Sequence, residues 1–229
     1  MPTADNEIRL ERVVAPHDGL AELQRVFDGS PDYVRLTKGA GPSGREALEL
    51  WEQIPSGVSR ADKWLFRLRQ GSVTVGCLDL LREYPGPGTD FLGLLLIPER
   101  MRGRSLGRRA CETAEAMLRA WGTRRLRLGV LEANAGAATF WKRMGFRPTG
   151  ERVPYRRGAV ESEVLLYEKE LEASGDEPTD PPRRRRRIRF VSDELVREIV
   201  RGEKTASVCR LGEVDLIEDE FDDHPGVLD

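Results

Sequence analysis

Arginine and glycine alternate in a short turn at residues 101–108, which read Met-Arg-Gly-Arg-Ser-Leu-Gly-Arg. An apolar run at 91–97 precedes this turn, and apolar residues at helical spacing follow it from Leu106 to Trp121. Backbone N–H groups at a turn and at a helix N-terminus are unpaired, and the helix dipole adds partial positive charge. The segment therefore predicts a site for a ligand that carries phosphates, and a capped helix with a solvated charged face is the alternative.

The elements that must position this turn follow from hydrophobic periodicity. The predicted strands lie at 8–14, 64–69, 73–83, 91–97, 125–131 and 164–170, and the predicted helices at 18–26, 44–53, 106–121 and 135–144. Turn residues fill 84–90, so the strands on either side are expected to pair antiparallel. A meander followed by a strand–helix–strand–helix order predicts an α+β (mixed α/β) domain, with helices flanking a mixed, largely antiparallel sheet.

Composition limits the class of protein. The chain has 229 residues, of which 39% are hydrophobic, enough for one domain or two. It has no apolar run of the roughly 18 residues that a membrane helix needs, and its first residues do not follow the order of a secretory signal. Three cysteines and two histidines without ligand spacing predict reduced thiols, no metal and a cytoplasmic location.

The chain divides near residue 171. Residues 172–187 are acidic and proline-rich and end in five arginines, a composition that predicts a linker. It would separate a domain at 1–171 from a segment at 188–229. The formal net charge of −2 hides this uneven distribution, because the arginines cluster locally and the last residues are acidic.

Three segments resemble one family when their order and spacing are taken together. They are the turn at 102–107, the strand that reaches Asn134, and the helix from Phe140 to Gly145 and Phe146. Residues 7–171 resemble the GNAT superfamily of N-acetyltransferases. The resemblance implies the GNAT fold for this domain. It also implies direct transfer of an acetyl group from acetyl-CoA to an amine of a small molecule, a peptide or a protein.

The resemblance further implies where acetyl-CoA would bind. Backbone N–H groups of the turn would hold the pyrophosphate, the arginines would add charge, and the pantetheine arm would pair with the strand at 95–97. The implied binding residues are Leu95, Leu96, Ile97, Arg102, Gly103, Arg104, Ser105, Leu106, Gly107, Arg108 and Asn134. The enzyme would hold both reactants, remove a proton and stabilise the oxyanion with a strand N–H.

Two residues depart from the family pattern. Ser105 replaces the usual first glycine of the turn, so the turn must accept a Cβ atom. Trp141 stands where many relatives have a tyrosine that protonates the leaving thiolate. Because an indole is not an acid at neutral pH, the catalytic acid is unknown.

Candidates for the base and for the acceptor pocket come from the remaining polar residues. Alternation along Val75 to Glu83 places Asp79 and Glu83 on one strand face, and either carboxylate could deprotonate an ammonium. The alternative for each is a solvated or salt-bridged carboxylate. Tyr33, Tyr84 and Tyr155 are candidates to line the acceptor site, with core packing as their alternative, and residues 30–33 are the expected specificity segment.

The C-terminal segment offers a second interpretation. A predicted helix ending at Gly202, followed by Lys204, Thr205 and Ser207, resembles the opening of an ASCH domain, a PUA-like fold associated with RNA. About 40 residues are too few to complete that fold, so a partial domain is expected. The alternative function is accordingly an RNA-associated module with a degenerate or RNA-modifying acetyltransferase domain. A homodimer is also left open.

Overall fold

The computed structural model describes residues 7–55 and 58–171. The strands in these ranges are β1 (Ile8–Val13), β2 (Lys63–Gln70), β3 (Val73–Leu81), β4 (Thr89–Leu96), β5 (Arg125–Leu131), β6 (Arg147–Arg157) and β7 (Val160–Glu170). The α-helices are α1 (Leu20–Asp28), α2 (Pro31–Lys38), α3 (Glu46–Glu52), α4 (Leu106–Ala120) and α5 (Ala135–Arg143). The predicted linker at 172–187 and the predicted segment at 188–229 lie outside the described residues.

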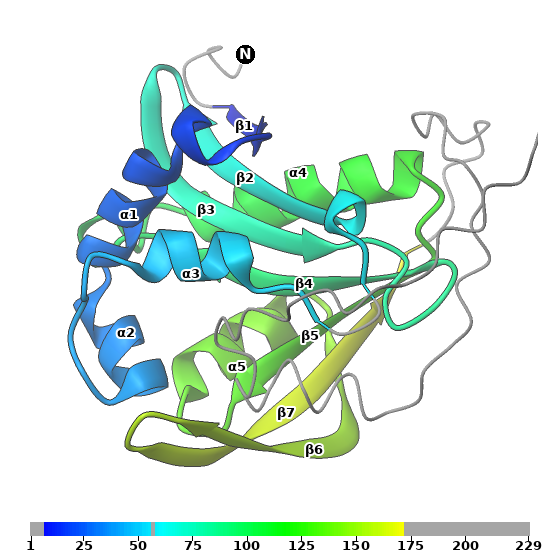
Figure 1. Ribbon diagram of the computed structural model, residues 1–229. Helices are drawn as coiled ribbons and strands as arrows, with labels where there is room; N and C mark the ends of the chain where they lie inside the picture. Colours follow the sequence, from blue (N-terminus) through cyan, green and yellow to red (C-terminus); the bar gives the residue numbers. More distant parts are fainter. Residues whose placement is uncertain (1–6, 56–57, 172–229) are drawn as a thin grey trace, which may run out of the picture.

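All strands of the described ranges form one sheet, in the order β1-β2-β3-β4-β5-β7-β6. Neighbouring strands pair antiparallel except β4 and β5, which are parallel. The sheet is therefore mixed and largely antiparallel, which confirms the predicted α+β class. The parallel pair lies in the middle of the sheet, and α4 forms the connection between its two strands (Figure 1).

Helices cover both faces of the sheet. In Figure 1, α1 and α3 lie in front of the strands and α4 lies behind them. The buried residues of α4 recur at helical spacing and pack into the main core; they are Leu106, Ala110, Cys111, Ala114, Glu115 and Leu118. The opposite face packs against α1, α2 and α3 in a second cluster. None of the helices in the described ranges is long and apolar enough to cross a membrane.

Two elements were not predicted from the sequence. Helix α2 begins with Pro31 in its first turn, a favourable position because its fixed φ suits a helix start, but only Val34 of this helix is buried. Strand β6 occupies the edge of the sheet and contains Pro148 and Pro154. Proline lacks an N–H group and is tolerated at a sheet edge, so the composition of β6 gave no strand signal.

Candidate active site

The parallel strands β4 and β5 separate part of the way along their length. Their pairing runs from Thr89 opposite Arg125 to Leu92 opposite Leu128 and then stops. Strand β4 nevertheless continues to Leu96, so its backbone groups on the β5 side have no strand partner beyond Leu92. A cavity of about 1070 Å³ opens here and is lined by both strands.

The turn between β4 and α4 is strained and rich in free donors. Gly103 has φ +78°, and Ser105, the N-cap residue of α4, has φ +58°. A residue with a side chain in this left-handed conformation costs roughly 1–2 kcal/mol. The turn thus accepts the Cβ atom of Ser105, but at a cost in strain. The backbone N–H groups from Gly103 to Arg108 donate to no acceptor among the described residues.

The predicted cofactor residues gather at this end of the cavity. All of them line the cavity except Arg104, whose exposed side chain lies outside its lining. The charged side chains that line this end are Arg102, Arg108 and Arg143. Arg102 donates from Nε to the Ile97 carbonyl over 3.2 Å, and Arg108 pairs with Glu112 at 3.1 Å. The end is therefore cationic, as phosphate binding requires.

Asn134 and Trp141 have structural partners on α5 or just after it. Asn134 is the N-cap residue of this helix, and its Oδ1 accepts from the Ala137 N–H over 3.1 Å. Trp141 is 7% exposed, and its ring packs against Phe140 and Phe146 at centroid distances of 4.8 and 5.2 Å. Both residues reach the cavity lining. The indole is thus anchored in the core and offers no acid to a leaving thiolate.

Asp79 lies beside the point where β4 separates from β5. It pairs with Leu94, while Leu80 pairs with Leu92, so Gly93 is an extra, bulged residue in β4. A Cβ atom on Gly93 would lie 2.6 Å from Asp79 Oδ2, which leaves glycine as the residue that fits this close approach. Lys63 Nζ is 2.9 Å from Oδ1 and 3.0 Å from Oδ2 of the same carboxylate.

The Lys63–Asp79 ion pair is almost completely buried. Both residues are 5% exposed, and both line the cavity. Lys63 makes a hydrogen bond to Oδ2, whereas Oδ1 is ion-paired with the same ammonium at 2.9 Å and accepts no hydrogen bond with regular geometry from the described residues. A charged oxygen in this position has capacity for a donor on a ligand.

Glu83, the other candidate base, lies elsewhere. Strand β3 ends at Leu81, and Glu83 follows in a turn with φ +55°. Its side chain is exposed and outside the cavity lining, and its N–H donates to Asp90 Oδ1 over 2.6 Å. The structure therefore brings only Asp79 to the cavity, because the strand alternation that would have aligned the two carboxylates stops first.

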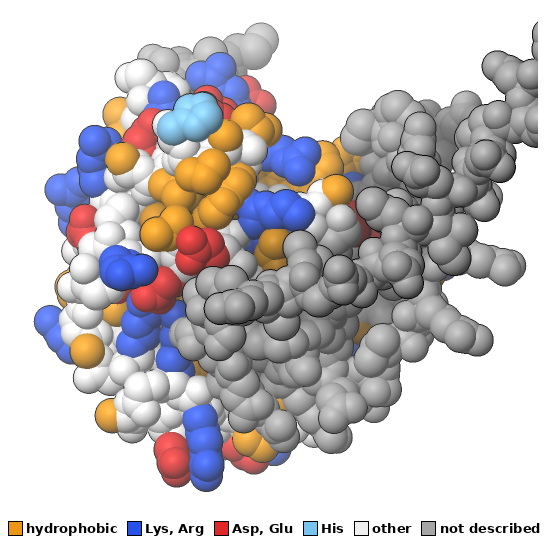
Figure 2. Space-filling model, viewed as in Figure 1, with side chains coloured by type: hydrophobic (Ala, Val, Ile, Leu, Met, Phe, Trp, Pro, Cys, Tyr) orange, Lys and Arg blue, Asp and Glu red, His pale blue; other side chains and the backbone are white. Residues whose placement is uncertain are grey.

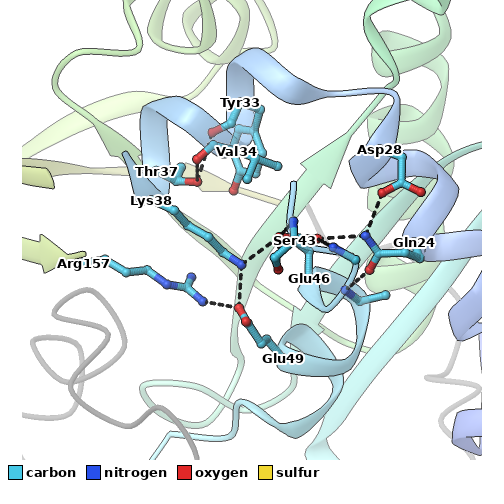
Figure 3. Close-up of polar contacts among 12 residues, drawn as sticks. Gln24, Asp28, Tyr33, Val34, Thr37, Lys38, Ser43, Glu46, Glu49 and Arg157 are labelled. Atoms are coloured by element: carbon cyan, nitrogen blue, oxygen red, sulfur yellow. Dashed lines mark hydrogen bonds and ion pairs between the residues drawn. The ribbon is translucent and has the colours of Figure 1, made fainter. Parts of the chain in front are cut away.

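A charged cluster on α2, α3 and β6 lines another part of the cavity, which we call its outer end (Figure 3). We call Lys38, Glu46, Glu49 and Arg157 the outer cluster. Lys38 Nζ lies 2.6 Å from Glu49 Oε2, and Arg157 Nη2 lies 2.8 Å from the same oxygen. Lys38 also contacts Glu46 Oε1 at 3.2 Å. Sequence reasoning missed this cluster because its members come from α2, α3 and β6, and Glu49 and Arg157 are 108 positions apart in the sequence.

Glu46 is a buried carboxylate that fixes this end in place. Burial alone would raise its pKa, but hydrogen bonds from the Ser43 N–H and hydroxyl and from Gln24 hold the pKa well below its usual range. These donors connect α1, the loop before α3 and α3 itself. The side chain of Lys38 is thereby held toward Glu49.

The predicted acceptor-site tyrosines divide into two groups. Tyr33 and Tyr155 line the cavity, and Tyr155 donates its hydroxyl to the Thr37 carbonyl over 2.6 Å. Burial raises the pKa of both phenols, so each is a neutral hydroxyl at pH 7. Tyr84 packs edge-on against Phe91 outside the lining.

Only part of the predicted specificity segment at 30–33 reaches the cavity. Asp32 and Tyr33 line it. Ser30 is fully buried, and its hydroxyl donates to the Val26 carbonyl over 2.8 Å. Ser30 therefore stabilises the junction of α1 and α2 and does not contact the cavity.

Comparison with known proteins agrees with this geometry. The model of the acetyltransferase (GNAT) family matches residues 31–146. An acetyltransferase from Thermus thermophilus is 32% identical, and the match covers 72% of this chain and 97% of that one with a TM-score of 0.55. A probable GNAT acetyltransferase from Chromobacterium violaceum is 19% identical, and the match covers 72% of this chain and 83% of that one with a TM-score of 0.57. At this identity the match shows the fold alone. No curated protein matches the chain. With the family model spanning the separated strands and the donor-rich turn, the protein belongs to the GNAT family and is an N-acetyltransferase that uses acetyl-CoA.

Proposed function

We propose that acetyl-CoA binds in the gap between β4 and β5, with its pyrophosphate on the turn at 103–108. The free N–H groups of this turn and the cationic lining from Arg102 and Arg108 support this placement. The unpaired edge of β4 at 95–97 would hydrogen-bond the pantetheine arm. Asn134 lines the same end. Arg104 would contribute long-range attraction only, since it lies outside the lining.

We propose Asp79 as the general base. The observation that carries this assignment is the position of its carboxylate at the Gly93 bulge, where the strands separate and where the thioester would lie. A base must lie within hydrogen-bond reach of the proton it removes, directly or through one water. Asp79 Oδ1 has the free acceptor capacity for this. Lys63 supplies the opposite charge that an ionised carboxylate needs at this depth.

The chemical step then involves few groups. The neutral amine nitrogen of the acceptor attacks the thioester carbonyl carbon, and Asp79 takes the N–H proton that the nitrogen loses as the amide forms. An oxyanion forms, and the backbone N–H groups of the unpaired β4 edge are the donors available to it. The oxyanion then collapses to the amide carbonyl, the C–S bond breaks, and coenzyme A leaves as a thiolate.

The acceptor in this proposal is an amine. The predicted ASCH-like segment with Lys204, Thr205 and Ser207 lies outside the described residues, so RNA contact stays a prediction, as does a homodimer. On the described part of the face in Figure 2, Lys and Arg side chains are interspersed with Asp and Glu. That face therefore does not offer the continuous basic surface typical of nucleic-acid binding.

The test compares the two candidate carboxylates. Asp79→Asn and Glu83→Gln are matched changes that each remove one charge, and thiol release from acetyl-CoA with an amine acceptor measures kcat. We expect Asp79→Asn to lose about 10²- to 10⁴-fold in kcat, the usual contribution of a general base, while Glu83→Gln stays near the wild type. Both variants should keep the rise in Tm that acetyl-CoA produces. An unchanged kcat in Asp79→Asn would contradict the assignment.

A further inference from the structure

The outer cluster has more hydrogen-bond donors than acceptors. Both oxygens of Glu46 are satisfied, because Oε1 accepts from Ser43 and Lys38, and Oε2 from Gln24 and Gly44. The cluster's remaining carboxylate is Glu49, and both cations bind the same atom of it, Oε2.

Arg157 has the largest unused capacity. A guanidinium presents five N–H donors in a planar fork, and Glu49 Oε2 takes one of them. The Tyr155 hydroxyl is the other neighbouring acceptor. Arg157 and Tyr155 lie two residues apart on β6 and both line the cavity, whereas Arg156 between them is exposed and pairs with Glu161. Among residues 7–55 and 58–171, no further acceptor binds the Arg157 fork, so its remaining donors are available to a ligand in the cavity.

The inner end of the same cavity has the opposite character. Asp79 Oδ1 is a buried anionic oxygen that has the Lys63 ammonium at 2.9 Å but accepts no regular hydrogen bond from the described residues, so it keeps acceptor capacity. Tyr33, Asp79 and Arg157 line the same cavity. A matching ligand therefore needs an N–H donor at one end and an anionic oxygen acceptor at the other.

We propose that the acetyl acceptor is a small amine that also carries a carboxylate. Its amine nitrogen would lie at Asp79, and its carboxylate would bind Arg157 and Lys38. This inference rests on the proposed function, because it assumes that the amine reacts at Asp79. A planar guanidinium binds a carboxylate through two parallel hydrogen bonds. A second ammonium at the outer end would instead face two cations with only Glu49 to bind it.

Glu49 has a defined role in this arrangement. It holds Lys38 and Arg157 in one place through Oε2, with side chains that are 18% and 24% exposed. The two cations are thus positioned before the ligand arrives, which lowers the entropic cost of binding.

The experiment uses pairs of acceptors that differ only in the carboxylate. Glycine, β-alanine and γ-aminobutyrate are compared with methylamine, ethylamine and propylamine, and thiol release from acetyl-CoA gives kcat/KM for each. In the wild type we expect one or more of the amino acids to exceed its paired amine by about 10- to 100-fold, the range of charge-assisted hydrogen bonds. The spacing of the best acceptor would measure the span between Asp79 and Arg157.

Variants locate the source of the preference. Arg157→Gln should lower kcat/KM for the amino acids toward that of the paired amines and so remove the preference for the carboxylate. Arg157→Lys should restore part of it, since the charge returns without the fork. Arg156→Gln is the matched control on the opposite side of the strand and should keep the full preference.

The outcomes separate this inference from the proposed function. Equal kcat/KM for the paired acceptors, or a preference that survives in Arg157→Gln, overturns the assignment of the acceptor. If none of the test amines is acetylated while acetyl-CoA still raises Tm, the assignment of the acceptor is also wrong, but the proposed cofactor site stands. If none of the amines is acetylated and acetyl-CoA does not raise Tm, the proposed function itself is contradicted.

Discussion

Removing either partner of the Lys63–Asp79 ion pair should destabilise the protein strongly. Each residue is 5% exposed, and the ammonium lies 2.9 and 3.0 Å from the two carboxylate oxygens. Removal of one partner leaves the other as an uncompensated buried charge, which typically costs about 3–5 kcal/mol. We therefore expect Asp79→Asn and Lys63→Met each to lower the free energy of unfolding by about that amount.

The double variant separates stability from catalysis. Replacing both charges by neutral groups removes the uncompensated charge, and such replacements are often neutral or stabilising. The double variant should therefore return to within about 1 kcal/mol of the wild type in unfolding free energy, which corresponds to a large favourable coupling between the two sites. Its kcat should stay about 10²- to 10⁴-fold low, because the base is still missing. Lys63→Met alone keeps the carboxylate and should keep more activity than either variant that lacks Asp79.

Two assays on the same protein samples distinguish a catalytic role of Asp79 from a purely structural one. Urea unfolding followed by tryptophan fluorescence gives the free energy of unfolding, and thiol release gives kcat. If the double variant recovers wild-type kcat along with its stability, Asp79 serves only as the partner of Lys63 and the proposed base is wrong. Additive destabilisation in the double variant would show that the two charges do not interact as the distances indicate.

Three further changes test other parts of the structure. Ser105→Gly should raise the free energy of unfolding by up to about 1 kcal/mol, because relief of the left-handed strain exceeds the added freedom of the unfolded chain; Ser105→Ala keeps its Cβ atom and should give no gain in urea unfolding. Arg102→Gln should weaken acetyl-CoA binding about tenfold in calorimetry, and less at high salt, whereas Arg100→Gln, exposed and outside the lining, should not. Glu46→Gln should lower stability at pH 7 by roughly 1.5–3 kcal/mol. In the wild type, the ionised Glu46 carboxylate contributes its full stabilisation above the ordinary carboxyl pKa of 4.5, and this stabilisation is lost as pH falls through the depressed pKa of the folded state. The unfolding free energy of Glu46→Gln should therefore fall less steeply below pH 4.5 than that of the wild type.

The sequence predicts most of the elements that position the proposed cofactor end. Apolar spacing is enough to place α4 and β5, and the arginine and glycine turn is local in the chain, so its position between β4 and α4 follows from neighbouring residues. The strain at Ser105 is also foreseeable, since a residue with a Cβ atom stands where the family usually has glycine.

The acceptor end depends on contacts that no local pattern contains. Strand β6 is an edge strand with prolines and many charged residues, so it has little apolar alternation, yet it supplies Tyr155 and Arg157. Helix α2 is only 8 residues long and buries a single side chain. The separation of β4 from β5 cannot be predicted from the sequence either, because the apolar run at 91–97 continues past Leu92, where the pairing stops.

The position of bound coenzyme A in a crystal structure tests the central claim most directly. We expect the pyrophosphate oxygens within hydrogen-bond distance of the N–H groups from Gly103 to Arg108, and the pantetheine arm along β4 beyond Leu92, with its sulfur near Gly93 and Asp79. Coenzyme A bound away from the gap, or strands β4 and β5 paired along their full length in the complex, would contradict the proposed site.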